Sequence, residues 1–416
     1  MRITWVTRSF LDYRIPVYKT LDDLCGHELT VIYNREVESP ELIQKITSVL
    51  HERAIGLTGE WRIGGKKKEN AQFANTGIRI PIQPGLLKCL KRSRPEVMLS
   101  DGFMQWTYAP LLFRLFHKVP HVMCYERTPY TERRCQGYRK LYRKAALRYI
   151  DHLCANGSLC GEYLRSLGVA EQDISYGQMA ADTSGMAAQV DAIPEKEQAA
   201  LRQNYPCSGP LFLYTGQIIP RKGVRQLLTA WRNLASPTAG LILLGDGEER
   251  RELEAWCRQN RLNNVFWVGK RPYDEVARFY RLADVFIIPT LEDNWSLVVP
   301  EAMACGLPVA CSIYNGCHPE LVHAENGWTF DPTDIKETAD TLRKIIATEK
   351  ETLQRMGEYS KKIVSLHTPA RAAATIFNAC RTAVHNCASS SCEIRRGGPS
   401  RKTRAKMVEL GCMMMG

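Results

Sequence analysis

The sequence predicts an α/β protein built from two doubly wound, parallel-sheet domains in tandem, and three observations support this prediction. Short apolar segments of strand length alternate with amphipathic segments of helix length, which is typical of parallel sheets covered by helices. This alternation lapses after about Asp182 and resumes near Gly209. The chain has 416 residues, more than one hydrophobic core usually supports.

The first domain is expected over residues 1–182. Its expected strands are ITWVT (3–7), ELTVIYN (28–34), GIRIPI (77–82), EVMLSDG (96–102), HVMCYE (121–126) and HLCANG (152–157). Helices are expected near Tyr13 to Cys25, from Gly85 to Lys91 and through Leu112. The start, MRITWVTRSF, resembles a first strand more than a signal peptide, because no long apolar run or small-residue cleavage site follows.

A polar linker is expected over residues 183–209, and a second domain over 210–386. The expected strands of the second domain are LFLYTG (211–216), AGLILLGDG (239–247), NVFWVGK (264–270), VFIIPT (285–290) and PVACS (308–312). Its helices are expected from Lys222, from Glu248 to Asn260, from Tyr273 to Ala283 and near Leu297 to Ala304, and its last helix can cross back onto the first domain. Residues 387–416 have six basic and two acidic residues without sustained apolar periodicity, which predicts a flexible basic tail.

The bulk composition narrows the class of protein. The 15 cysteines are scattered through apolar stretches, which is typical of reduced thiols in the cytosol. Cys305, Cys311 and Cys317 lack the short paired spacing of zinc sites, so no metal site is expected. No segment reaches the roughly 18 to 20 apolar residues of a membrane span. The net charge of +12 permits anionic partners without choosing among them.

The most informative segment is PTLEDNWSLVVPEAMACGLPV at 289–309, where an apolar strand ends in an acidic loop before a helix. The helix is expected to begin near Ser296, and Gly306 and Pro308 fit its end. Helix N-termini expose unpaired N–H groups and partial positive charge. The amides of Ser296, Leu297 and Val298 could therefore cradle a diphosphate.

Two carboxylates and one lysine stand beside this turn. Asp293 precedes the helix and can point into a cleft, and Glu301 lies one turn inside and can accept hydrogen bonds from sugar hydroxyls. The alternative is that Asp293 only caps the helix and Glu301 is solvated. In TGQIIPRKGVRQLL at 215–228, Lys222 follows a strand and can act as a point charge on phosphate, although lysines at helix starts are commonly just solvated.

Together these segments resemble the retaining glycosyltransferase family 4, which has the GT-B fold of two facing Rossmann-like domains. The family carries a G-R-x-x-x-x-K-G loop and an E-x7-E loop followed by A-M-A-x-G-x-P-V. This chain has GQIIPRKG, then DNWSLVVPEAMACGLPV, then GCHPELVHAENGWTFDPTD. The resemblance covers essentially residues 210–346. TRSFLDYRIPVY and NGSLCGEYLRSLGV resemble the family more loosely.

The resemblance implies roles for individual residues. Glu301 would bind the nucleotide ribose, Asp293 the donor-sugar hydroxyls and Lys222 the diphosphate. Gly269 and Lys270 would meet the nucleobase through their backbone. Glu320 also matches a family position and is assigned to substrate binding.

Three departures from the family pattern affect these roles. Asp293 stands where the family usually has Glu, and Gln217 stands where it usually has Arg, so Lys222, with Arg221, must carry more of the phosphate charge. Where many relatives have a His after the fifth expected strand, this chain has Tyr-Glu-Arg-Thr at 125–128. Glu126 could act in catalysis and Arg127 could contact substrate, or either could be a structural ion-pair residue.

The resemblance implies a metal-independent glycosyltransferase without a cofactor. It would move a sugar from a nucleotide-diphosphate donor to a glycan or lipid-linked acceptor in polysaccharide or glycoconjugate assembly, with retained configuration. The alternatives are a nucleotide-sugar epimerase, or a non-catalytic protein of the same fold that binds nucleotides, nucleic acid or membranes. The intact pattern around Lys222 and Glu301 argues against a non-catalytic role and makes nucleic acid an unlikely partner.

A basic segment bears on the location of the protein. TERRCQGYRKLYRKAALRYI at 131–150 has apolar residues at helical spacing, with basic residues from Arg133 to Arg148 around them. This predicts a core-packed helix with a solvated basic face or, alternatively, a surface for anionic lipid. The protein is therefore expected in the cytoplasm, with peripheral attachment to the inner face of the membrane through residues 133–148 or the tail.

Overall fold

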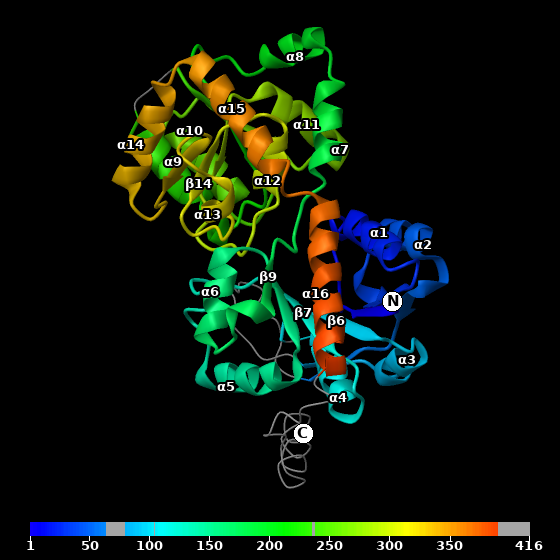
Figure 1. The fold of residues 1–416 in the computed structure, drawn as a ribbon. Coiled ribbons are helices and arrows are strands. Elements are labelled where there is room, and N and C mark those ends of the chain that lie inside the picture. Colours follow the sequence, from blue (N-terminus) through cyan, green and yellow to red (C-terminus); the bar gives the residue numbers. More distant parts are fainter. Residues whose placement is uncertain (64–79, 104, 235–237, 390–416) are drawn as a thin grey trace.

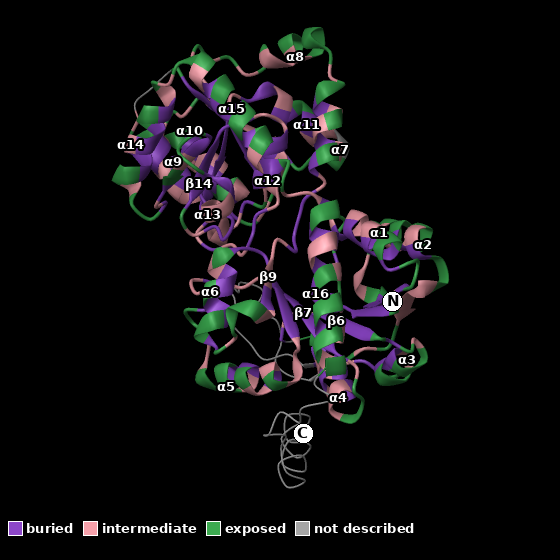
Figure 2. Cartoon of the chain, viewed as in Figure 1, coloured by how far each residue is buried: buried purple, intermediate pink, exposed green. Residues whose placement is uncertain are grey.

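The computed structural model describes residues 1–63, 80–103, 105–234 and 238–389. Over these residues the chain forms two α/β domains, one above the other in Figure 1, each with a parallel sheet and covering helices. The strands of both sheets are largely buried, whereas the outer faces of the helices are exposed (Figure 2). The predicted two-domain α/β class is confirmed.

The N-terminal sheet has the strand order β3-β2-β1-β6-β7-β8-β9, and all its pairs are parallel. Its strands are β1 (Ile3–Val6), β2 (Leu29–Asn34), β3 (Ala54–Leu57), β6 (Val97–Asp101), β7 (His121–Tyr125), β8 (His152–Ala155) and β9 (Ile174–Tyr176). β1, β7 and β8 are buried along their whole length, as expected for strands covered on both faces.

The expected strand at 77–82 does not belong to this sheet. The described part, β5 (Ile80–Ile82), pairs antiparallel with β4 (Trp61–Ile63) in a separate two-stranded sheet. Pro81 lies inside β5 and has no N–H to donate to a central ladder, which favours such an edge position. The place beside β2 is taken by β3, a short strand that the apolar pattern did not predict.

The helices of the N-terminal domain alternate with its strands along the chain and cover the sheet. They are α1 (Arg14–Leu24), α2 (Pro40–Leu50), α3 (Leu86–Arg92), α4 (Tyr108–Phe116), α5 (Gly137–Ala146) and α6 (Ser158–Ser166), with short 3₁₀ turns η1 (Arg35–Val37), η2 (His51–Arg53), η3 (Gln105–Thr107), η4 (Leu147–Tyr149) and η5 (Glu171–Asp173). α2 was not predicted, although its start signal is present. The Ser39 hydroxyl accepts from the Leu42 amide and Pro40 occupies the first helical position, as is favourable at an N-terminus.

The C-terminal sheet has the strand order β12-β11-β10-β13-β14-β15, again all parallel. Its strands are β10 (Leu211–Thr215), β11 (Gly240–Leu244), β12 (Val265–Gly269), β13 (Val285–Ile288), β14 (Val309–Ser312) and β15 (Gly327–Phe330). In each domain the strand order reverses beside the first strand. Ligands of doubly wound sheets bind at such a reversal, outside the carboxyl ends of the strands.

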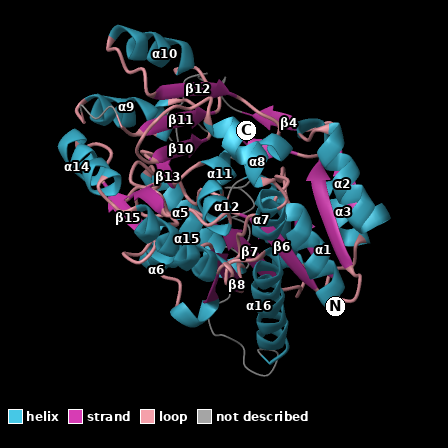
Figure 3. Cartoon of the chain, turned by 90° about the horizontal axis from the view of Figure 1, so that it is seen from above, coloured by secondary structure: helices cyan, strands magenta, loops and turns pink. Residues whose placement is uncertain are grey.

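Helices also surround the second sheet, and two of them, α7 (Thr183–Asp191) and α8 (Glu195–Arg202), lie within the expected linker. Met186 and Val190 of α7 are buried in the core of the C-terminal domain, so α7 packs on that domain. The others are η6 (Pro220–Lys222), α9 (Val224–Arg232), α10 (Arg250–Gln259), α11 (Tyr273–Leu282), α12 (Val298–Ala304), α13 (His318–Leu321), α14 (Ile335–Ile346) and α15 (Lys350–Val364). α9, α10 and α14 lie on one side of the molecule in Figure 3, and α1, α2 and α3 lie on the other.

The last described helix, α16 (Pro369–Ser389), returns to the N-terminal domain and packs along α1 (Figure 1). Ala372, Ile376 and Ala379 are buried in the same core as Val17 and Leu21 of α1, because small residues at helical spacing allow close approach of the two helices. The helix continues through residue 389, past the expected start of the tail at 387. The rest of that tail, 390–416, lies outside the described residues.

Candidate active site

Side chains from both domains meet between the carboxyl edges of the two sheets. The Asn294 side chain donates to Glu126 Oε1 at 3.5 Å, and Arg133 forms an ion pair with Glu292 at 2.6 Å. These contacts join the loop after β13 to the loop after β7, each of which follows the carboxyl end of its strand. This is where facing doubly wound domains form a ligand site.

Asp293 and Lys222 form an ion pair at this junction, and their side chains are only 13% and 15% exposed. The Lys222 ammonium lies 2.5 Å from Asp293 Oδ2, which also accepts from the Ser296 hydroxyl at 2.7 Å. Burial alone would raise the pKa of Asp293, but the charge and hydrogen bond of Lys222 bring it below its ordinary value. The Trp295 amide donates to Asp293 Oδ1 at 3.2 Å, so this carboxylate braces the loop before α12. It does not cap the helix as the alternative expected, because the N-cap of α12 is Leu297 and has no side-chain cap hydrogen bond.

The position of Lys222 depends on the glycine that follows it. Lys222 ends the 3₁₀ turn η6, and Gly223 has φ +70°. A Cβ on Gly223 would lie 2.0 Å from the Pro289 carbonyl oxygen, a distance that no side chain tolerates. The close approach of this turn to the loop after β13 therefore requires glycine, and it brings two segments about 70 residues apart into contact.

Arg221 and Gln217 have different surroundings from Lys222. Arg221 Nη1 donates to the Glu292 carbonyl at 2.9 Å, so part of its guanidinium braces the acidic loop. Gln217 is exposed, and its carbonyl accepts from the Tyr214 hydroxyl at 2.7 Å.

Glycines that the motif reading did not single out shape the neighbouring loops. A Cβ on Gly245 would lie 1.8 Å from the Gly216 carbonyl oxygen, and one on Gly247 would lie 2.3 Å from the Ile218 carbonyl oxygen. Gly216 and Gly245 also have φ of 148° and 152°. The loops after β10 and β11 are therefore in backbone contact. The spacing LGDG after an apolar strand is the signal that could have identified this contact.

The three amides that were predicted to bind a diphosphate differ in their hydrogen bonding. α12 begins at Val298, two residues later than expected near Ser296, and the Ser296 amide donates to the buried Asn315 side chain at 3.3 Å. Within the described part of the chain, the amides of Leu297 and Val298 have no protein acceptor. Two of the three amides are thus left for a ligand, and Asn315 is a supporting residue that sequence reasoning missed.

Glu301 is neither solvated nor open to the junction on all sides. Tyr273 donates to its Oε1 at 3.2 Å and Tyr280 to its Oε2 at 3.1 Å. Burial raises the pKa of Glu301 to about 7 although both tyrosine hydroxyls act to lower it, and the charge of Asp182 raises it further. The solvated alternative is therefore wrong. Both tyrosines were missed because nothing in the local sequence links them to Glu301.

Gly269 and Lys270 lie at the end of β12. The Gly269 carbonyl accepts from the Gly245 amide at 3.0 Å, so it is used within the sheet. Its φ is +82°, and Lys270 is exposed beside it. The nucleobase role of these two residues stays a prediction.

Glu126 lies on the N-terminal side of the junction. Burial raises its pKa, the charges of Arg127 and Arg14 lower it, and those of Asp101 and Asp293 raise it. Arg14 was not singled out from the sequence, yet it is buried 3.7 Å from Asp101 and donates to Gln178. The Arg14 guanidinium therefore offsets part of the negative charge of Asp101 and Glu126 at the carboxyl edge of the N-terminal sheet.

Arg127 and Glu320 both have structural contacts. Arg127 lies 3.7 Å from Glu132, as the ion-pair alternative expected. Glu320 Oε1 accepts from the Ser158 amide at 2.5 Å, so it caps the N-terminus of α6 in the other domain. A Cβ on Gly157 would lie 2.7 Å from the Glu320 carboxyl carbon. Glu320 therefore joins the two domains in this structure.

The basic segment differs from its expected form. The helix α5 starts only at Gly137, and Arg139 and Arg143 are buried. Arg143 pairs with the buried Glu132 at 2.6 Å, and Arg133 pairs with Glu292 of the C-terminal domain at 2.6 Å. The prediction that all basic residues from Arg133 to Arg148 share a solvated face is wrong, because carboxylates distant in sequence or in the other domain bind several of them.

The described residues contain neither a cluster of metal-ligand side chains nor a helix that could span a membrane. Over these residues, no three His, Cys, Asp or Glu side chains gather as they would around a metal ion, and Cys305, Cys311 and Cys317 are free thiols. In the same part of the chain, no helix combines the length and apolarity needed to span a bilayer.

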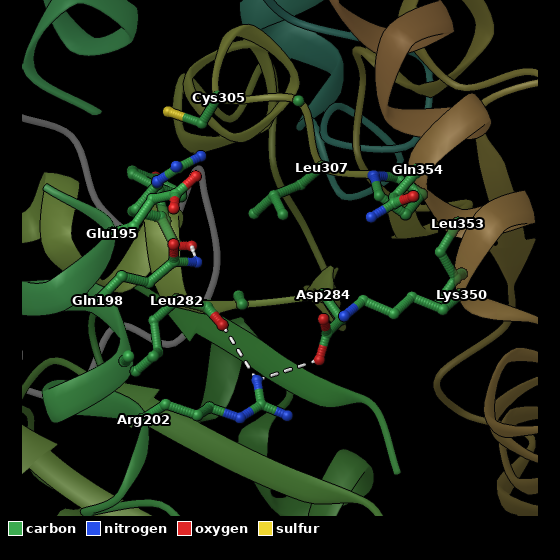
Figure 4. Close-up of a pocket in the computed structure, with 16 residues that line it drawn as sticks. Glu195, Gln198, Arg202, Leu282, Asp284, Cys305, Leu307, Lys350, Leu353 and Gln354 are labelled. Atoms are coloured by element: carbon green, nitrogen blue, oxygen red, sulfur yellow. Dashed lines mark hydrogen bonds and ion pairs between the residues drawn. The ribbon is translucent and has the colours of Figure 1, made fainter. Parts of the chain in front are cut away.

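A cavity of about 640 Å³ lies at the opposite, amino edge of the C-terminal sheet and contains none of the predicted site residues (Figure 4). Arg202 donates to the Leu282 carbonyl and to Asp284, each at 3.1 Å, and Asp284 also accepts from the Leu211 amide at 2.8 Å. Arg202 and Asp284, two charged residues that line this cavity, therefore hold α8 against the start of β13.

Comparisons with known proteins agree with the resemblance in the C-terminal half. Residues 197–363 match the family model of glycosyl transferases group 1. The chain is 28% identical over 153 residues to an uncharacterized glycosyltransferase of Methanocaldococcus jannaschii, covering 36% of this chain and 43% of that protein. It is 30% identical over 156 residues to a sulfoquinovosyl transferase of Arabidopsis thaliana (37% and 29%), and 31% over 169 residues to an O-antigen chain mannosyltransferase of Escherichia coli (37% and 42%). The match thus spans less than half of each relative.

Solved structures are similar over almost the whole chain. A glycosyltransferase from Rickettsia africae has a TM-score of 0.70 at 14% identity, covering 92% of this chain and 99% of that one. An Anabaena protein solved with UDP and glucose has a TM-score of 0.65 at 16% identity (95% and 100%). A sucrose-phosphate synthase from Thermosynechococcus elongatus has a TM-score of 0.68 at 18% identity (93% and 100%). The chain therefore has the GT-B fold, and its residues 197–363 match the glycosyl transferases group 1.

Proposed function

We propose that this protein transfers a sugar from a nucleotide-diphosphate donor to a glycan or lipid-linked acceptor, with retained anomeric configuration, in polysaccharide or glycoconjugate assembly. The observation that carries the proposal is the largely buried Lys222–Asp293 ion pair at the domain junction, next to Asn294, whose side chain donates to Glu126. The group 1 match, the relatives that are named sugar transferases and the UDP-bound neighbour of the same fold support it.

The donor fits this site through complementary charge. An ammonium has three donors, and Asp293 uses one of those of Lys222. The remaining donors can bind diphosphate oxygens together with the amides of Leu297 and Val298. Lys222 and Ser296 occupy Asp293 Oδ2, so Asp293 offers the remaining acceptor site of Oδ1 to a donor-sugar hydroxyl. Glu301 offers its own oxygens to the ribose. Gln217 brings no charge, so Lys222 and the second terminal nitrogen of Arg221 balance the diphosphate.

The proposed reaction forms one bond and breaks one at the anomeric carbon. The acceptor oxygen bonds to this carbon, the bond from the carbon to the diphosphate breaks, and the acceptor proton passes to the departing diphosphate. Negative charge grows on that leaving group, where fixed donors stabilise it most in a site that excludes water. Lys222 and the helix amides fill this role without a metal ion, and Glu126 is the catalytic candidate on the acceptor side.

The acceptor is proposed to reach the N-terminal domain at a membrane surface. The exposed side chains of α5 include Tyr138, Lys140, Leu141 and Lys144. Leu141 is 72% exposed, and an exposed apolar side chain between lysines is typical of helices that lie on anionic lipid. The expected location is therefore the inner face of the cytoplasmic membrane.

A nucleotide-sugar screen tests the function directly. Stabilisation by UDP-, GDP- or ADP-sugars should appear as a rise in melting temperature, since a ligand at 100 times its dissociation constant adds about 2.7 kcal/mol. Release of nucleoside diphosphate on addition of bacterial lipid extract should follow for the same donor and persist in EDTA. The anomeric configuration of the product, read by NMR, tests retention.

Three outcomes would contradict parts of the proposal. Binding without transfer would favour the non-catalytic alternative. Interconversion of free nucleotide sugars would favour an epimerase. Loss of activity in EDTA that a divalent ion restores would overturn the metal-independent mechanism. As a matched control, Asp293→Asn should abolish diphosphate release, whereas Asp340→Asn, on the exposed face of α14, should not.

A further inference from the structure

Resting on the function proposed above, we propose that Tyr273 and Tyr280 are positioning residues that hold the Glu301 carboxylate toward the ribose of the donor and let the site distinguish ribonucleotides from deoxyribonucleotides. The two tyrosines begin and nearly end the same helix, α11, seven residues apart. This spacing puts them on one helix face two turns apart. Their hydroxyls reach the two different oxygens of one carboxylate.

The two contacts differ in how firmly they are held. Tyr280 is 1% exposed, and its hydroxyl lies 3.3 Å from the Thr215 hydroxyl as well as 3.1 Å from Glu301 Oε2. Tyr273 is 47% exposed and lies 3.2 Å from Oε1. Tyr280 therefore anchors the carboxylate from inside the domain, and Tyr273 restrains it on the solvent side.

The proposed preference for ribose over 2′-deoxyribose follows from the number of hydrogen bonds that a carboxylate can accept. An ionised carboxylate has about four lone-pair sites, two on each oxygen. Each tyrosine occupies one site on its own oxygen, so one site remains on each of the two adjacent oxygens. A ribose carries its 2′- and 3′-hydroxyls on adjacent carbons, which matches two adjacent acceptors. A 2′-deoxyribose leaves one of these acceptors without its donor, and the loss of a hydrogen bond to a partly buried charged acceptor is costly.

The surroundings of Glu301 make this recognition depend on pH. The titratable and charged groups that face it or its helix are Tyr273 and Tyr280 on α11, Asp182 and Asp191 at the two ends of α7, Cys305 on α12 and Lys361 on α15. Burial is the largest influence and raises the pKa of Glu301 to about 7. Protonation turns an acceptor oxygen into a donor, so ribonucleotide affinity should fall as pH falls through about 7, and deoxyribonucleotide affinity should fall less.

The test measures nucleoside diphosphate binding by calorimetry across about pH 5.5 to 8.5. UDP, GDP and ADP are titrated first, and the tightest of them is compared with its 2′-deoxy form. In the parent, the ribonucleotide should bind about tenfold tighter above pH 7.5 than the deoxyribonucleotide, as expected for the loss of one hydrogen bond to a charged acceptor. Tyr280→Phe should reduce this ratio to near one and move the fall in affinity to higher pH, because it removes a bond that lowers the Glu301 pKa. Tyr273→Phe should act in the same direction by about threefold.

The controls separate this inference from the proposed function. Tyr359→Phe, at 48% exposure on α15, should leave both ratio and pH profile unchanged. If none of the three diphosphates binds the parent, the proposed function fails. If one binds and the ratio and pH profile are the same in Tyr273→Phe as in the parent, this inference fails while the function stands. Because Tyr273 is half-exposed, this second comparison stays decisive even if Tyr280→Phe does not fold.

Discussion

The carboxyl edges of the two domains have the same strand topology but are built by different means. The C-terminal edge depends on backbone contact at glycines, such as Gly245 against Gly216, around one ion pair. The N-terminal edge and the helices near it depend on buried arginine–carboxylate pairs, such as Arg14 with Asp101 and Arg143 with Glu132. Glycine spacing is local in sequence, whereas the partners of these arginines are distant. This explains why a motif identified one edge and not the other.

The largest expected effect tests the buried charge of the N-terminal domain. Glu132→Ala leaves the buried Arg143 without its carboxylate, which should destabilise the fold by about 3 to 5 kcal/mol. Glu171→Ala removes the partner of the exposed Arg165 and should change the stability little, because solvent screens exposed ion pairs. Urea unfolding of the full chain measures both. Equal losses would mean that the Arg143 pair behaves as a solvated surface pair, and the contrast between the edges would be wrong.

The next effect concerns the ion pair of the C-terminal edge. Lys222→Ala should lower turnover by the equivalent of about 2 to 4 kcal/mol in transition-state stabilisation, because it removes a largely buried charge that we propose stabilises the leaving diphosphate. Gln217→Ala, at an exposed neutral side chain, should change turnover little. Steady-state kinetics with the donor found in the screen compares them. Comparable losses would show that Lys222 does not compensate for the missing arginine.

Glu301→Gln should trade ligand affinity for stability. The pKa of Glu301 is raised to about 7 in the folded chain, so its contribution to stability is present at low pH and is lost as pH rises through about 7. At pH 8 the neutral amide should therefore stabilise the domain by about 2 to 3 kcal/mol, and below about pH 4 it should make little difference. Thermal unfolding at both pH values measures this. Nucleotide affinity should fall, and a variant that is less stable at pH 8 would contradict the assigned burial.

A glycine pair sharpens the comparison of the two edges. Gly245→Ala adds a Cβ 1.8 Å from the Gly216 oxygen and should destabilise the C-terminal domain by about 2 to 3 kcal/mol. Gly59 in the N-terminal domain has φ +78°, but among the described residues no atom lies within 4 Å of the Cβ that Gly59→Ala adds, so this change should cost about 1 kcal/mol. Chemical unfolding gives both values. A Gly59 effect as large as that of Gly245 would mean that backbone contact does not distinguish the edges.

The smallest effect is at the membrane face of the N-terminal domain. Lys140, Lys144 and Arg148 are exposed, and each basic residue near an anionic surface contributes about 1 kcal/mol. Changing all three to Gln should weaken sedimentation with anionic vesicles at low salt, where the parent binds, and the binding should fade at high salt. The matched control changes Lys336, Lys344 and Lys362 of the C-terminal domain to Gln.

A truncation after Ser389 separates α5 from the tail and keeps α16 whole. Ending the chain near Val384, by contrast, would remove the last residues of a helix that packs in the N-terminal core. If the truncation abolishes vesicle binding and the α5 changes do not, the tail is the attachment. If the parent ignores anionic vesicles, the membrane proposal fails.

The fold class followed from the alternation of strand-like and helix-like segments. The errors in individual strands have physical causes. β3 and β9 are only 4 and 3 residues long, too short to show a period. The segment ending in β5 has the apolar character of a strand, but only pairing partners decide whether a strand joins the main sheet or a separate hairpin. Single-residue signals such as Pro81 narrow that choice without making it.

For the site, the sequence by itself determined the residues of the C-terminal edge and their types. Asp293, Lys222 and Glu301 came from spacing and resemblance, because a loop at a strand end keeps its chemistry within a short segment. Only the tertiary structure decided their states. In the structure Lys222 pairs with Asp293, two tyrosine hydroxyls donate to Glu301, and Glu320 caps a helix of the other domain. The reason is that burial and the distance between charges set protonation and bonding, and both depend on residues far apart along the chain.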